Sequence, residues 1–143
     1  MTRKVILLVE DNAIDEELMI RALRKARILN DVAVARDGAE AVDYVFSTGK
    51  HRGRVGDMPW VVLLDLNLPK LSGLEVLARI RANPRTTELP VVILTSSSER
   101  QDVLEGYRAG ANSYVVKPVD STEYCETVKR LGWYWLTVNV PLV

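Results

Sequence analysis

The sequence predicts an α/β fold with one parallel sheet, and three features of its 143 residues indicate this. Five short apolar runs alternate with five stretches of helical periodicity, which is typical of strands joined by crossover helices. The most apolar run, residues 61–64, contains only branched side chains, as in a strand buried on both faces. A hydrophobic content of 48% is enough for one well-buried domain of this length.

We expect five strands, over residues 5–9, 32–35, 61–64, 90–95 and 113–116. Each is followed by a helix whose start is marked by an N-cap residue: Asn12, Asp37, Ser72, Ser98 and Asp120. In the first helix, acids such as Asp15 in the first turn and basic residues in the last turn complement the helix dipole. At this length the alternation predicts a flavodoxin-like, doubly wound five-stranded parallel sheet of order 2-1-3-4-5, in three α/β/α layers.

The predicted domain covers residues 1–143, with a core over about 4–136 and an apolar tail over 137–143. Four residues of the last helix share its inward face: Tyr124, Val128, Leu131 and Trp135. That face leaves Trp133 and Tyr134 without a place in the core, and surplus aromatic residues are enriched at interfaces. We therefore expect a homodimer through the last helix and tail, with Trp133, Tyr134 and Trp135 as candidate contacts. The alternative is a tail that packs back on its own domain.

Composition limits the partners. Nineteen basic and nineteen acidic residues balance, so net charge supports neither nucleic acid nor an anionic membrane as a ligand. The N-terminal apolar run of five residues is too short for a signal peptide or a membrane span, and the single cysteine, Cys125, cannot form an internal disulfide. We expect a cytoplasmic protein.

A long loop over residues 47–59, basic at 50–54, is either a solvated surface loop or a patch where a partner docks.

Polar residues follow the predicted strands at their carboxyl ends, where ligands of doubly wound sheets bind. They are Glu10, Asp11, Asp65, Asn67, Thr95 and Lys117. Neighbouring carboxylates repel one another and a single lysine offsets this only in part, so a divalent cation would complete the balance. Oxygen ligands without imidazole or thiolate favour Mg²⁺, with Mn²⁺ as the other possibility.

This arrangement favours phosphoryl transfer to a carboxylate. An aspartate can act as the nucleophile on phosphorus, and we assign Asp65 as the acceptor. Lys117 would pair with Asp65 at rest and with a phosphoryl oxygen afterwards, and Thr95 would donate its hydroxyl to another phosphoryl oxygen. The predicted metal ligands are Asp11, Asp65 and the backbone carbonyl of Asn67, with Glu10 acting directly or through water.

These residues resemble a known signature. Over residues 4 to about 136, the chain is similar to the response-regulator receiver domain of two-component signalling, through Glu10-Asp11, Asp65, Leu68-Pro69 with Gly73, Thr95, Tyr114 and Lys117-Pro118. The resemblance implies a phosphohistidine donor on a sensor histidine kinase and a requirement for Mg²⁺. It also implies a phosphoacceptor that assists its own phosphorylation and dephosphorylation without being an ordinary enzyme.

The same resemblance implies a switch and a backbone feature. Thr95 and Tyr114 would form the switch pair, changing the surface made by the fourth helix, fifth strand and fifth helix. The peptide bond before Pro118 would be cis. The long loop before Trp60 and the sequence of residues 65–69 also resemble those of the small single-domain regulators paired with bacterial phytochromes.

Two departures and two alternatives accompany this interpretation. Glu10 stands in place of the commoner aspartate, and Ser72 stands where many relatives have aspartate. A phosphatase similar to the haloacid dehalogenases would need an acid where this chain has Asn67, and an amide cannot donate a proton as a general acid. The other alternative is a binding module of the same fold that works without phosphorylation.

Overall fold

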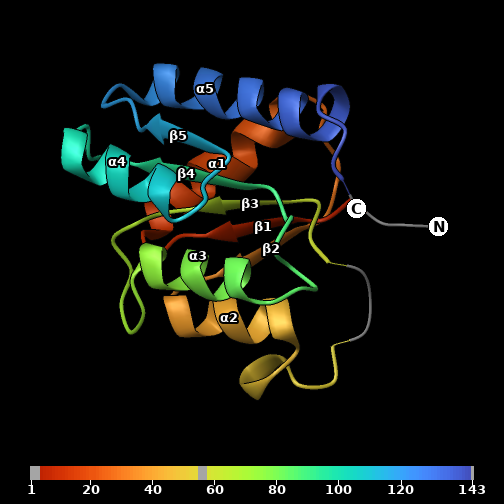
Figure 1. Cartoon of the computed structure of the whole chain (residues 1–143). Coiled ribbons are helices and arrows are strands. Elements are labelled where there is room, and N and C mark those ends of the chain that lie inside the picture. Colours follow the sequence, from red (N-terminus) through yellow and green to blue (C-terminus); the bar gives the residue numbers. More distant parts are fainter. Residues whose placement is uncertain (1–3, 55–57, 143) are drawn as a thin grey trace.

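The structure, a computed structural model, describes residues 4–54 and 58–142. Its centre is a parallel sheet of order β2-β1-β3-β4-β5 (Figure 1). The strands are β1 (Ile6–Val9), β2 (Val32–Ala35), β3 (Val61–Leu64), β4 (Val91–Thr95) and β5 (Ser113–Val116). The order confirms the predicted flavodoxin-like arrangement. Neighbouring strands are all parallel, because each crossover helix returns the chain to the same end of the sheet.

Helices cover both faces of the sheet (Figure 1). They are α1 (Ala13–Lys25), α2 (Gly38–Phe46), α3 (Gly73–Ala82), α4 (Arg100–Arg108) and α5 (Ser121–Trp133), and a π-helical turn, η2 (Tyr134–Val138), follows α5. Helices α1 and α5 pack against each other over one face, and α2 packs beside α3 over the other. Helix α4 lies on the α3 side, because its Gly106 faces the core residues Ile93 and Tyr114 of that layer.

Strand register brings the carboxyl ends of the central strands together. Val9, the last residue of β1, is level with Leu64, the last residue of β3. Each of these strands is buried along its whole length, which explains why their residues are apolar without alternation. The residues that follow them, Glu10 and Asp65, therefore emerge side by side at one edge.

Most predicted helix starts are confirmed by cap hydrogen bonds. Asn12, Asp37, Ser72 and Asp120 each accept bonds from backbone N–H groups of the following turn. The prediction for Ser98 was wrong, because α4 begins at Arg100 after Glu99. Ser97 organises this turn instead, since its Oγ accepts from the Glu99 amide at 3.3 Å and donates to Asp102 at 2.5 Å.

The long loop after α2 packs on that helix over its described part. It contains a short 3₁₀ turn, η1 (Gly49–His51), and His51 Nε2 lies 3.1 Å from a carboxylate oxygen of Glu40. The guanidinium of Arg54 sits 4.2 Å from the centre of the Tyr44 ring. These contacts anchor the basic stretch, while residues 55–57 lie outside the described part. Within the two described stretches, no helix is both long and apolar enough to cross a membrane.

The first residue of α3 must be glycine because the helix starts against the backbone that follows β3. A Cβ on Gly73 would lie 2.3 Å from the Asp65 carbonyl oxygen and 2.7 Å from the Leu66 Cα. We expect Gly73→Ala to lower the free energy of unfolding by about 1–3 kcal/mol, measured by urea denaturation, since backbone must move.

Gly132→Ala is the matched control. Its Cβ would meet only the side-chain ends of Ile28 and Leu23, at 2.5 and 2.8 Å, and these can rotate while the helix gains propensity. Its loss of stability should be smaller, and equal losses would contradict the assignment of strain to the α3 start.

Candidate functional site

Three carboxylates gather at the carboxyl edge of the sheet. Glu10 and Asp11 follow β1 and Asp65 follows β3, and each has a carboxylate oxygen within 4.8 Å of the others. Glu10 and Asp65 are buried, whereas Asp11 is exposed. The edge thus has oxygen donors open to solvent on one side, which suits a hard divalent cation.

A single ammonium group holds this cluster. Lys117, one residue beyond β5, places Nζ 2.7 Å from Glu10 Oε1 and 3.0 Å from Asp65 Oδ2. Its backbone N–H donates to the Thr95 carbonyl at 2.7 Å, which ties its position to the end of β4. The predicted resting pair of Lys117 and Asp65 is therefore present in the structure.

Burial and the charge of neighbouring groups shift the pKa values of Glu10 and Lys117 in opposite directions. Burial raises the pKa of Glu10 to about 7, against the lowering effect of its bond to Lys117, and Asp65 adds to the rise by repulsion. Burial alone would lower the pKa of Lys117, but bonds and charges from Glu10 and Asp65 raise it above its ordinary value. The lysine is therefore a permanent cation, whereas burial favours the protonated form of Glu10.

Asp11 and Asn67, two and three residues beyond the ends of β1 and β3, are both exposed, and Asp11 belongs to the acidic group. The backbone N–H of Asn67 donates to Asp65 Oδ1 at 3.1 Å, so the turn after β3 holds the Asp65 carboxylate in place. The Asn12 N–H holds Glu10 Oε2 in the same way, at 3.1 Å. The metal roles assigned to these residues stay predictions.

Thr95 and Tyr114 come from neighbouring strands. Thr95 is fully buried, and its Oγ1 has no hydrogen-bond partner among the described residues. Tyr114 donates its hydroxyl to the Ser97 carbonyl at 2.9 Å, and burial raises its pKa. Because Ser97 is two residues beyond Thr95, a shift of Thr95 would reach the Tyr114 ring through this short segment.

One backbone prediction was wrong. The peptide bond between Lys117 and Pro118 is trans, as are the peptide bonds of all the described residues. The cis and trans forms of an X–Pro bond differ by only about 1 kcal/mol, so a sequence motif alone does not decide between them.

One residue of the site was not predicted from the sequence. Asp15, which we assigned only to the helix dipole, places Oδ2 3.0 Å from Lys117 Nζ. Its spacing from the acidic pair, about one helical turn, is the only feature that could have indicated this contact.

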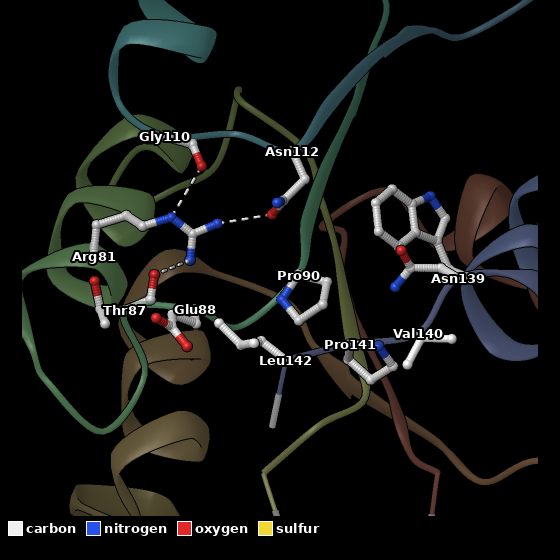
Figure 2. A pocket seen from close by; sticks show the side chains of 11 residues that line it. Arg81, Thr87, Glu88, Pro90, Gly110, Asn112, Asn139, Val140, Pro141 and Leu142 are labelled. Atoms are coloured by element: carbon white, nitrogen blue, oxygen red, sulfur yellow. Dashed lines mark hydrogen bonds between the residues drawn. The ribbon is translucent and has the colours of Figure 1, made fainter.

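The described residues also form a hollow at the opposite end of the sheet, with a volume of about 420 Å³ (Figure 2). Arg81 stands at one side and donates to the Gly110 carbonyl at 2.9 Å, the Thr87 carbonyl at 3.1 Å and Asn112 Oδ1 at 2.8 Å. These bonds tie α3 to the loops before β4 and β5. None of the strand-end acids reaches this hollow, so the candidate phosphoryl site is the cluster around Asp65.

Several known proteins are similar to this chain. The sequence profile of the response regulator receiver domain matches residues 6–129. Response regulator Rcp1 of Synechocystis sp. is 37% identical over 139 residues, covering 96% of this chain and 93% of Rcp1. Its Mn²⁺-bound structure superposes with a TM-score of 0.90 at 35% identity, covering 98% and 99% of the two chains.

Two further solved structures are similar over nearly the whole chain. The phosphorylated cyanobacterial phytochrome response regulator RcpA has a TM-score of 0.91 at 34% identity, covering 99% of this chain and 100% of RcpA. The bacteriophytochrome response regulator AtBRR has a TM-score of 0.80 at 45% identity, covering 100% of this chain and 99% of AtBRR. With the profile match over most of its length and the acidic edge in place, this chain belongs to the response regulator receiver domains of two-component signalling.

Proposed function

We propose that Asp65 accepts a phosphoryl group from the phosphohistidine of a sensor histidine kinase. The observation that carries this proposal is the convergence of Glu10, Asp11 and Lys117 on the Asp65 carboxylate, from strands far apart in the sequence. An Asp65 oxygen forms the new bond to phosphorus while the bond from phosphorus to the histidine nitrogen breaks. The imidazole leaves with that electron pair.

The residues of this edge fit a divalent cation. Asp11, Asp65 and the Asn67 carbonyl would hold it, with Glu10 bound directly or through water, and all of these donors are oxygen. Such donors favour Mg²⁺, and Mn²⁺ is the ion named for the Rcp1 structure. A bound Mg²⁺ would neutralise charge that develops on the phosphoryl oxygens.

The protein's own residues take the remaining charge. The Lys117 ammonium would move from Asp65 Oδ2 to a phosphoryl oxygen. This movement is short, because Lys117 Nζ already lies 3.0 Å from Asp65 Oδ2, next to where the phosphoryl group would be attached. The buried Thr95 hydroxyl, unpaired within the described chain, would donate to a second phosphoryl oxygen. That new bond satisfies a buried polar group, which favours the phosphorylated arrangement.

The output would be a change of surface. A shift of Thr95 toward the phosphoryl group would displace Ser97, two residues further along the chain, whose carbonyl accepts the Tyr114 hydroxyl. Tyr107 of α4 lies beside Tyr114, with ring centres 6.5 Å apart, so α4 and β5 would respond together. The surface of α4, β5 and α5 is therefore the proposed output face.

The proposal for the partner kinase rests on the similarity of this chain to known phytochrome response regulators. RcpA and AtBRR are phytochrome response regulators by name, and both align with nearly all of this chain. We therefore propose a bacteriophytochrome as the phosphoryl donor, and a cytoplasmic location belongs to the same proposal.

We also propose a homodimer through α5, η2 and the tail. Trp133 and Tyr134 are about half exposed, at 48% and 47%, whereas Trp135 is partly buried and accepts the Trp60 indole N–H at 3.0 Å through its carbonyl. Residues 139–142 line the hollow of Figure 2, yet Val140 and Leu142 stay largely exposed. Although the tail packs against its own chain, it thus leaves apolar surface exposed that a second copy would cover.

Replacing the acceptor tests the main proposal. With Mg²⁺ and phosphoramidate, the wild type should gain one phosphoryl group by intact mass, and Asp65→Asn should gain none. Asp11→Asn and added chelator should each slow uptake by about 10²-fold, because a metal supplies several kcal/mol of charge stabilisation. Uptake of one group by Asp65→Asn would overturn the assignment.

The buried Glu10 predicts a pH effect in chelator. The folded protein holds this proton up to about pH 7, but the unfolded chain releases it near 4.5, so folding binds a proton between these values. The wild type should therefore lose roughly 1–3 kcal/mol of unfolding free energy relative to Glu10→Gln as pH rises from 5 to 7.5. Urea denaturation at both pH values measures this. A constant difference between the two proteins would contradict it.

Light scattering tests the dimer. The wild type should have twice the mass of one chain, and Trp133→Ala combined with Tyr134→Ala should shift it toward one chain. Tyr107→Ala is the control, because that ring is similarly exposed, at 51%, but lies on α4. A wild-type monomer, or a dimer lost equally in the control, would rule out this interface.

A further inference from the structure

Lys117 has a third carboxylate partner that lies outside the predicted metal site. Its Nζ is 3.0 Å from Asp15 Oδ2, in addition to its contacts with Glu10 and Asp65. An ammonium group has three N–H donors, so these three carboxylates satisfy it completely. We propose that Asp15 is a positioning residue that keeps Lys117 in place while a divalent cation occupies the site. This inference rests on the proposed function of Asp65.

The helix start explains why Asp15 is available. Asp15 is the third residue of α1, where an acid normally bonds back to the N–H of the N-cap residue. Here the N–H of the N-cap, Asn12, is already bound by Glu10 Oε2 at 3.1 Å. The Asp15 carboxylate is thus left to reach Lys117. Its backbone is fixed as well, because Asn12 Oδ1 accepts from the Asp15 N–H at 3.0 Å.

The charges give Asp15 a distinct task. Glu10 and Asp65 belong to the group of acids that could hold a metal, but Asp15 does not. A divalent cation at that site would compete with Lys117 for Glu10 and Asp65, and it would also repel the ammonium. Of the three described carboxylate partners of Lys117, Asp15 is then the one that the cation would not bind. By drawing the ammonium to its side, it lowers the competition and keeps the lysine near the acceptor.

The α5 side of the cluster supports this placement. Tyr124 is buried, and its hydroxyl has no hydrogen-bond partner among the described residues. Burial raises its pKa, Lys117 lowers it, and Asp15 raises it again. The charges of Lys117 and Asp15 thus both act on this buried side chain, and Lys117 itself keeps only 9% of its side-chain surface exposed.

A purely structural role makes a different prediction. If Asp15 only complements the helix dipole, its loss should weaken folding slightly and leave metal affinity unchanged. Glu17 is the matched control, because it lies in the same part of α1 but pairs with Arg21 at 2.6 Å. Comparing Asp15→Asn with Glu17→Gln thus separates contact with Lys117 from general charge on the helix.

Calorimetric titration with Mg²⁺, on the full chain, tests the proposal. We expect Asp15→Asn to weaken Mg²⁺ binding about 5- to 10-fold, since freed ammonium competes for the acids, and Glu17→Gln to change it by less than about twofold. In the Lys117→Met background the Asp15→Asn effect should shrink to about twofold or less, because a residue that acts through Lys117 has nothing left to position.

The outcomes separate cleanly. Equal effects of Asp15→Asn and Glu17→Gln, or an Asp15→Asn effect of the same size in both Lys117 backgrounds, would overturn the positioning role. Thermal melts check that each variant is folded. If Lys117→Met does not fold, nitrogen-15 NMR of the Lys117 ammonium replaces it: slow hydrogen exchange in Mg²⁺-loaded wild type and fast exchange in Asp15→Asn are expected, and equal exchange would overturn the proposal. A wild type that takes up neither Mg²⁺ nor a phosphoryl group refutes the proposed function itself.

Discussion

The balance of charge around Lys117 is the constraint on which the rest of this structure depends. One ammonium group contacts three carboxylates, on Glu10, Asp15 and Asp65, and all four groups sit at the end of a buried sheet. Like charges this close are stable only with opposite charge beside them. The protein supplies one positive charge, Lys117, directly after β5. A divalent cation would supply the rest.

That balance depends on the sheet register. The level ends of β1 and β3 place Glu10 and Asp65 together, and the bond from the Lys117 N–H to the Thr95 carbonyl brings the lysine to them. Short strands without alternation make this possible, because their side chains are buried on both faces and do not tolerate a slip. The glycine at the start of α3 adds to this control by letting the helix approach the Asp65 backbone.

The two ends of the sheet serve different purposes. The carboxyl edge gathers charge, while the opposite end carries the hollow that is lined by Arg81 and by residues of the tail. The proposed switch residues, Thr95 and Tyr114, lie toward α4, and the exposed Trp133 is the last residue of α5. A signal from the acidic edge thus has a short path to the output face and a longer one to the proposed dimer surface.

The sequence by itself determined the strand order, four of the five helix caps and the gathering of Glu10, Asp11, Asp65 and Lys117 at the strand ends. It could do so because apolar runs, N-cap side chains and strand-end polar residues act locally or repeat a known pattern. Only the tertiary structure decided that Asp15 reaches Lys117, that Ser97 rather than Ser98 organises the start of α4, and that the bond before Pro118 is trans. Each of these depends on which nearby group has already taken a competing hydrogen bond, or on an energy difference of about 1 kcal/mol, and neither is visible in residue spacing.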